Sequence, residues 1–158
     1  MPKSGDDESL LLVVLDQGYE RSAWHGPNLR QALRGITAEQ AAWRPTTGRH
    51  NIWEIAVHAA YWKYRVRRKL LGGNGGSFSL KGSNWFKRPM EISEEAWRAD
   101  LALLESEHRK LRQALSDYVA GKARALPPRT LFGVAFHDVY HAGQIRLLRR
   151  LYEQNRSD

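Results

Sequence analysis

The chain of 158 residues contains no cysteine. This absence excludes disulfides, thiolate metal ligands, iron–sulfur clusters and a cysteine nucleophile. Any metal ion that the protein binds must therefore be held by histidine, aspartate, glutamate or water. Any thiol that takes part in its chemistry must come from a second molecule.

Long hydrophobic runs are also lacking. No apolar stretch approaches the ~18 residues that a membrane-spanning helix requires, so we expect no membrane partner. The apolar run at residues 10–15 is too short for a signal peptide and has no basic region directly before it. We therefore expect a soluble, cytoplasmic protein.

Acidic residues are outnumbered, 17 against 25 Lys and Arg, which gives a net charge of +8. The basic residues crowd the segment from Lys63 to Lys69, but no DNA- or RNA-binding motif accompanies them. Successive helical residues rotate by about 100°, so these cations fall on several sides of a helix. We expect a solvated surface without a specific nucleic-acid site, and the alternative is binding or steering of an anionic molecule.

The apolar residues recur at helical spacing, and no alternating strand pattern of useful length is present. The expected helices run from about 9 to 33 with a kink or a brief break at Gly26-Pro27, from 51 to 71, from 93 past 115, and from 128 to 152. The sequence thus predicts an all-α fold, an up-and-down four-helix bundle with a long loop between helices 2 and 3. We expect the bundle to span residues 9–152, after a disordered lead-in over 1–8 and before a tail over 153–158.

Two capping boxes are expected, Thr37 with Gln40 and Asn51 with Glu54, because each pair has the spacing at which two side chains satisfy the first turn. The long loop contains Phe78, Trp85 and Phe86. Aromatic residues in such a connection often cover a site, so the loop is a candidate cover.

The strongest motif is the segment from His137 to His141, which reads His-Asp-Val-Tyr-His. Two histidines four apart on a helix point about 40° from each other, so both imidazoles can reach one point beside the helix. This spacing suits two ligands of a divalent metal. The alternative is a pair of partly buried histidines bonded to water or backbone, and the spacing alone does not decide between the two.

Four further histidines compete to be a third ligand. His58 lies in the middle of the second helix, and this position favours it. His108 lies on the apolar stripe of the third helix, where a core histidine is the usual case. His25 stands at the Gly26-Pro27 break, where a capping role is expected, and His50 precedes the second helix and is expected to be exposed.

Several motifs together resemble a known family. Residues 51–54 (Asn-Ile-Trp-Glu) lead to 58–62 (His-Ala-Ala-Tyr-Trp), and 137–145 read His-Asp-Val-Tyr-His-Ala-Gly-Gln-Ile. With 23–27 (Ala-Trp-His-Gly-Pro), they are similar to motifs of the DinB/YfiT-like superfamily of bacterial metal-binding four-helix-bundle proteins. The resemblance covers roughly residues 9–152.

The resemblance implies one metal-binding histidine on the second helix and two on the fourth, which are His58, His137 and His141 here. It further implies a divalent metal with water in its open positions, and a homodimer. Some relatives are transferases or isomerases that use low-molecular-weight thiols, and others are described as hydrolases. Imidazole ligands suit Zn, Ni, Fe and Co, so the sequence leaves the identity of the metal open.

Two functions remain as hypotheses. The first is an enzyme that activates water or an exogenous small thiol at the metal and acts on a small molecule, as a hydrolase or a thiol transferase. The second is a non-catalytic, metal-stabilised bundle that binds a ligand or a partner. A serine hydrolase is disfavoured, because no Gly-x-Ser-x-Gly elbow is present.

Candidate residues around the metal have ordinary structural alternatives. Gln144 could orient the substrate or bound water, or form an interhelical hydrogen bond. Glu54 could act as an acid or base, or cap its helix. Asp138 points away from His137 and is expected to bond a neighbouring helix or a ligand's second nitrogen. Tyr61 and Trp62 could line the pocket, and at least one of them is expected to pack in the core.

Overall fold

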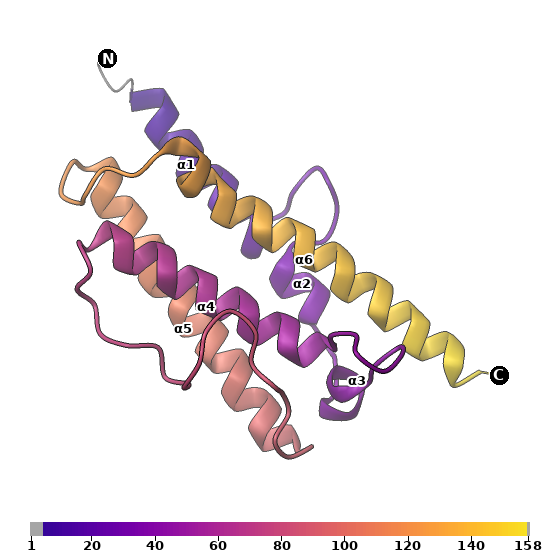
Figure 1. Ribbon diagram of the computed structural model, residues 1–158. Helices are drawn as coiled ribbons and strands as arrows, with labels where there is room; N and C mark the ends of the chain where they lie inside the picture. The colour runs from indigo at the N-terminus through magenta and orange to yellow at the C-terminus, as the bar shows by residue number, and fades with distance from the viewer. Residues whose placement is uncertain (1–4, 158) are drawn as a thin grey trace.

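The computed structural model describes residues 5–157 of the chain, and the side chains of residues 10–157. Within these residues the fold is all-helical, with six helices and no strand (Figure 1). The long helices are α1 (Gly5–Tyr19), α4 (Ile52–Leu70), α5 (Glu94–Val119) and α6 (Pro128–Asn155). The short helices are α2 (Leu29–Leu33) and α3 (Ala38–Ala42). The predicted all-α class is confirmed.

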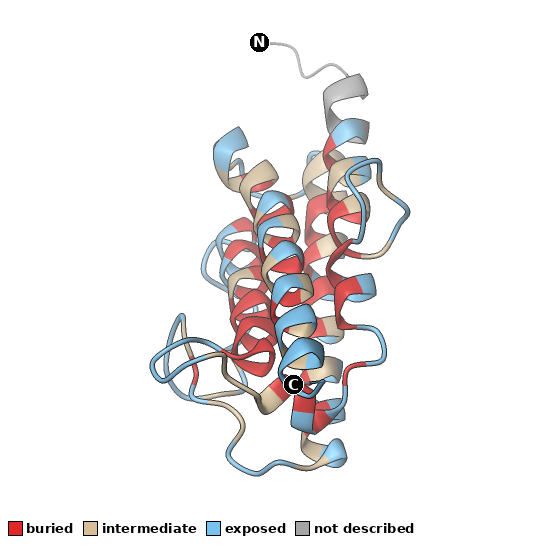
Figure 2. Cartoon of the chain, turned by 90° about the vertical axis from the view of Figure 1, so that its right-hand side faces the viewer, coloured by how far each residue is buried: buried red, intermediate tan, exposed pale blue. Residues whose placement is uncertain are grey.

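The long helices pack along one another, α4 against α5 and α1 against α6, and α4 also contacts α6 (Figure 1). Their buried residues face inward and their exposed residues face outward (Figure 2). The apolar interior has two clusters, one around Trp53 and Trp97 and the other around Leu15, Leu111 and Leu131. No helix of the described part is long and apolar enough to cross a membrane.

The expected first helix, from 9 to 33 with a kink or a brief break at Gly26-Pro27, is interrupted earlier and over a longer stretch than predicted. Helix α1 ends at Tyr19, and α2 begins only at Leu29. Asn28 starts α2 with a complete capping box to Gln31, which makes α2 a separate helix rather than the far side of a kink. The expected lead-in over 1–8 lies partly outside the described residues, and α1 begins within it, at Gly5.

Only one of the two hydrogen bonds of the capping box predicted for α4 is present. The Asn51 side chain accepts a hydrogen bond from the backbone N–H of Glu54 at 2.8 Å, as expected. The carboxylate of Glu54 does not return to Asn51, because Arg44 donates to both of its oxygens, at 2.6 and 2.9 Å. The pair at α3 is likewise one-sided: Thr37 accepts from the N–H of Gln40.

Two basic residues of α4 are buried, contrary to the expected solvated surface. Lys63 pairs with Asp138 of α6, and both side chains are 0% exposed. Arg67 pairs with Glu107 of α5 at 3.2 Å. These ion pairs join α4 to its two neighbours away from water, where an unpaired charge would be costly. The Lys63–Asp138 pair holds α6 against α4 and thereby positions His137, the residue directly before Asp138.

The long connection between α4 and α5 folds back over α4. Its Phe78 and Phe86 pack against Tyr61, with ring centroids 5.4 and 5.5 Å away. Tyr61 is buried in this cluster, so its role is core packing. These aromatic contacts hold the loop on both sides of Asn84 and Trp85, and these two residues lie beside His58.

Candidate metal centre

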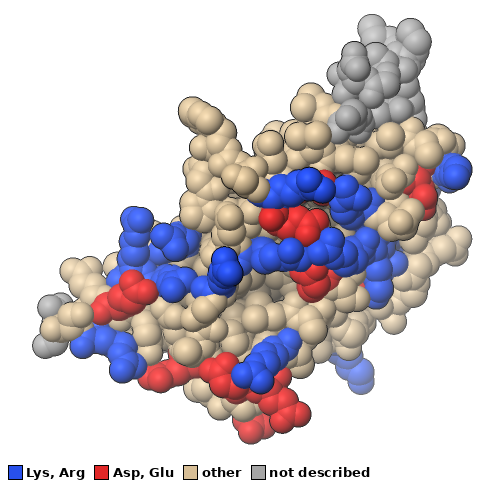
Figure 3. Space-filling view, turned by 180° about the vertical axis from the view of Figure 1, so that it is seen from behind, with Lys and Arg blue, Asp and Glu red and all other residues tan. Residues whose placement is uncertain are grey.

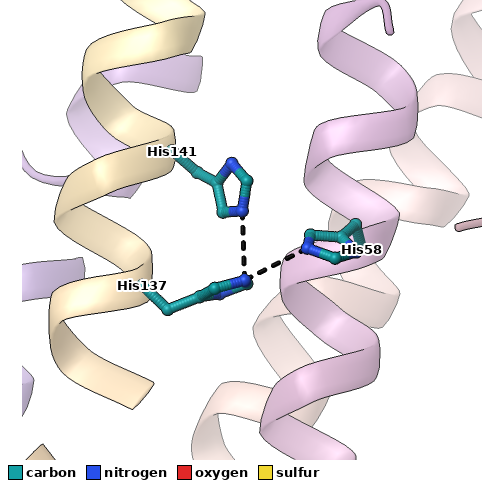
Figure 4. Close-up of side chains that lie close together, drawn as sticks. All are labelled: His58, His137 and His141. Atoms are coloured by element: carbon teal, nitrogen blue, oxygen red, sulfur yellow. Dashed lines mark hydrogen bonds between the residues drawn. The ribbon is translucent and has the colours of Figure 1, made fainter. Parts of the chain in front are cut away.

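Three histidines from two helices meet at one point. His58 extends from α4, and His137 and His141 extend from α6 toward it (Figure 4). The Nε2 atom of His137 lies 3.1 Å from that of His58 and 3.0 Å from that of His141. The ligand atoms of all three lie within 4.8 Å of one another. The structure thus brings together the three histidines that the sequence singled out.

The outer nitrogens of two of these rings are held by acceptors. His58 Nδ1 donates to the backbone carbonyl of Asn84 at 2.8 Å, and His141 Nδ1 donates to Oε1 of Gln144 at 2.6 Å. A neutral imidazole carries one hydrogen, so each of these rings turns an unprotonated Nε2 toward the cluster. Metal-binding histidines are commonly oriented in this way by carbonyl oxygens.

The contacts within the cluster favour a cation at its centre. The unprotonated Nε2 atoms of His58 and His141 both approach His137 Nε2, which can carry at most one hydrogen. One of the two contacts would therefore bring two lone pairs together. Nitrogens bound to one metal at ~2.1 Å lie about 3.0–3.4 Å apart, close to the observed separations. The residues present fit a divalent metal bound by three imidazoles.

Burial keeps all three histidines neutral. Burial, together with the neighbouring histidines, lowers the pKa of His137 to about 3, and burial lowers that of His141 to about 4. Burial also lowers the pKa of His58, against the raising effect of the Asn84 carbonyl. The neutral form is the one that binds metal ions, so the cluster is ready to bind at pH 7.

Aromatic rings enclose the histidines on one side. The Trp85 indole stacks between His58 and His50, with centroid distances of 3.8 and 3.6 Å. Trp62 lies edge-on to His58 and His137 at 6.4 Å, and its Nε1–H donates to Asn84 Oδ1. The aromatic loop therefore covers this site through Trp85, while Phe78 and Phe86 pack elsewhere.

The other candidate residues are placed as follows. Gln144 contacts the cluster through His141, and its described hydrogen bonds, to His141 and Tyr140, both lie within its own helix. Glu54 is occupied by Arg44 and His50 and contacts none of the three histidines. Asp138 bonds the neighbouring helix through Lys63, the first of its two expected roles.

Asn84 was not predicted from the sequence. It contributes a backbone carbonyl to His58 and its side chain to Trp62. Its φ of 64° is in the left-handed region, which asparagine tolerates better than most residues. A Gly-Ser-Asn turn was therefore the available signal, but no local pattern shows which distant ring its carbonyl would meet.

A second group of potential ligands consists of Asp16, Glu20 and His108. Its carboxylates are already paired: Arg112 donates to both oxygens of Asp16, and Arg109 binds Glu20 at 2.8 Å. Acidic and basic side chains intermingle on the face shown in Figure 3. The nearby positive charges oppose a further cation, so this group is an ion-pair network.

Comparison with known proteins identifies the family. The DinB superfamily matches residues 23–145, which is more than half of the chain and includes all three clustered histidines. The chain belongs to the DinB superfamily. The resemblance inferred from the sequence motifs is thereby confirmed. No curated protein and no solved structure matches this DinB superfamily member.

Proposed function

We propose that this protein is a divalent-metal-dependent enzyme whose metal is held by His58, His137 and His141. It acts on a small molecule with water or an exogenous small thiol as the nucleophile, as a hydrolase or a thiol transferase. The observation that carries the proposal is the convergence of three neutral Nε2 atoms at 3.0–3.1 Å. Membership in the DinB superfamily agrees with it.

The ligand set determines what this site offers. Three neutral imidazoles leave the full charge of a bound divalent metal uncompensated, which would lower the pKa of water or of a thiol at the site toward neutrality. The chain itself supplies no thiol, because it has no cysteine. Gln144 and the Asn84 carbonyl hold two of the rings in place, and Trp85 shields them from solvent.

Substrate access is available beside His137. This histidine, together with Trp62 and Val134, lines a cavity of about 250 Å³ between α4 and α6. Of the three histidines, His137 alone lines this cavity. An open cavity at a ligand supports a catalytic metal site, because a purely structural site is closed by a fourth protein ligand.

The non-catalytic alternative is supported by one observation. The histidines come from α4 and α6, so a metal at this site would join two helices and stabilise the fold whether or not it turned over a substrate. Turnover assays on the metal-loaded protein, with and without a small thiol, separate the two functions.

The expected result is turnover of an ester, amide or electrophilic substrate that is lost in each of the variants His58→Ala, His137→Ala and His141→Ala. The control His25→Ala removes an exposed histidine outside the cluster and should keep activity. Thiol dependence would indicate the transferase. A metal-loaded protein that melts higher but is inert toward the whole panel would support the non-catalytic bundle instead.

The up-and-down four-helix bundle, the cytoplasmic location and the homodimer belong to the same proposal. Four long helices in mutual contact support the bundle. Exposed Phe136, Tyr140 and Leu147 on α6 support the homodimer, because monomers seldom expose several large apolar side chains on one helix. Light scattering at micromolar concentration would contradict the dimer if it gave the mass of one chain.

A further inference from the structure

The cavity beside His137 continues into a basic groove. Besides His137 and Trp62, the cavity of about 250 Å³ is lined by Arg65, Lys69 and Arg129. A second cavity of about 540 Å³ shares Arg65 and Lys69 with it and adds the cations Arg68 and Arg124. The two cavities therefore adjoin and run along the C-terminal half of α4, from the histidines to the glycine-rich turn after it.

The cations of this groove have no acidic partner in the part of the chain that the structure describes. Arg65 is 3.5 Å from the hydroxyl of Tyr61, and Arg68 donates to the Gly73 carbonyl and the Tyr64 hydroxyl. No described acidic residue lines either cavity. Five cations gathered without carboxylates repel one another, and an anion in the groove would relieve this repulsion.

Many arginines elsewhere in the molecule are paired with carboxylates. Arg44, Arg67 and Arg112 each bind a carboxylate of the chain. On the opposite side, the cavity lined by Arg30 and Arg98 also contains Glu20, Glu94 and Glu105. The absence of acidic residues is thus a property of the groove beside the histidines and is not simply a consequence of the net charge of +8.

We infer that the groove binds the anionic end of the substrate, a small molecule that carries a phosphate or carboxylate group. Guanidinium groups match the geometry of both oxyanions and bind them with two hydrogen bonds. Trp62 and Val134, between the cations and His137, provide an apolar surface for the middle of the molecule. The substrate is therefore amphipathic, with its reacting group at the histidines and its anion at Arg65, Lys69 and Arg129.

This inference rests on the proposed function, because it places one end of that function's substrate, but its test needs no metal. The full chain is stripped of metal on a chelating resin and titrated calorimetrically with pyrophosphate and with succinate. The groove variant is Arg65→Gln/Arg129→Gln. The matched control, Arg98→Gln/Arg150→Gln, removes the same charge from exposed arginines outside the groove that make no described salt bridge.

Wild type and control should bind at least one probe, and the groove variant should bind it at least about tenfold more weakly, as expected for the loss of charge-assisted hydrogen bonds. Preference for one probe identifies the oxyanion. Because the titration is carried out without metal, failure of the metal site would leave this result intact. Equal weakening in both double variants, or no saturation by either probe below about 10 mM, would overturn the inference. So would duplex DNA that binds the groove more tightly than either probe.

Discussion

The chemistry of the candidate site depends on which nitrogen of each histidine faces inward. Two rings are fixed by an acceptor on Nδ1, one from the backbone of a loop and one from a side chain of the same helix. The sequence could predict the pair four residues apart, because that geometry is local. It could favour His58 only by its position in a helix, and it could not show Asn84, whose contact depends on the path of a whole loop.

Gln144 is expected to act through His141. Replacing it by alanine removes the acceptor at 2.6 Å from Nδ1 and frees the ring to turn. We expect metal affinity to fall by about 10–100-fold, the usual cost of losing such a partner. Competition with a chromophoric chelator measures this, with the exposed Gln154→Ala as control. Unchanged affinity together with a lower kcat would assign Gln144 to the substrate instead.

Buried neutral histidines make the metal-free fold sensitive to acid. Burial lowers the pKa of His108 to about 2, helped by the charge of Lys63, and lowers those of His137 and His141 to about 3 and 4. The folded values lie below the unfolded value near 6.5, so the unfolded chain binds more protons below that pH. Stability is therefore full above about pH 6.5 and falls as the pH drops toward the folded values.

Each such histidine contributes at most about 1.4 kcal/mol of lost unfolding free energy per pH unit. Urea unfolding of the metal-free protein between pH 5 and 7.5 should show this slope. The variant His108→Gln should show a smaller pH slope of the unfolding free energy than the wild type, because glutamine does not titrate. An identical slope in wild type and variant would contradict the burial of a neutral His108.

Among the elements, α4 and α6 supply the three histidines of the site, one and two respectively. The start of α4 at Asn51 was predictable from a local capping motif, and so was its amphipathic length. An interruption at Gly26-Pro27 was predicted, but the separate start of α2 was not, although the Asn28–Gln31 capping box directly after the proline marks it. The burial of Lys63 was not predictable, because its partner Asp138 is distant in sequence and belongs to another helix.

The Lys63–Asp138 pair is expected to fix α6 against α4. Replacing Lys63 by methionine leaves a buried carboxylate unpaired, which typically costs about 3–5 kcal/mol. The double variant Lys63→Met/Asp138→Leu should recover most of this loss, since two apolar side chains then pack together. Urea unfolding measures both, with the exposed Lys69→Met as control. A double variant as unstable as Lys63→Met would contradict a pairing role.

At the scale of the whole molecule, acidic and basic residues are unevenly distributed over the surface. The side with Asp16, Glu20 and Glu105 pairs its arginines, whereas the groove beside the histidines leaves five cations without described acidic partners. The excess of basic residues was evident from the sequence, but which of them have acidic partners was not. Two of the basic residues of α4 turn inward and three turn outward, and the helix packing decides which.

The central claim is that His58, His137 and His141 bind one divalent metal ion. Elemental analysis of the purified chain, after loading and removal of excess metal, tests it most directly. We expect one ion per chain in the wild type and in His25→Ala, and none in the double variant His137→Ala/His141→Ala. Retention of metal at wild-type occupancy in that double variant, with the fold verified by circular dichroism, would contradict the account.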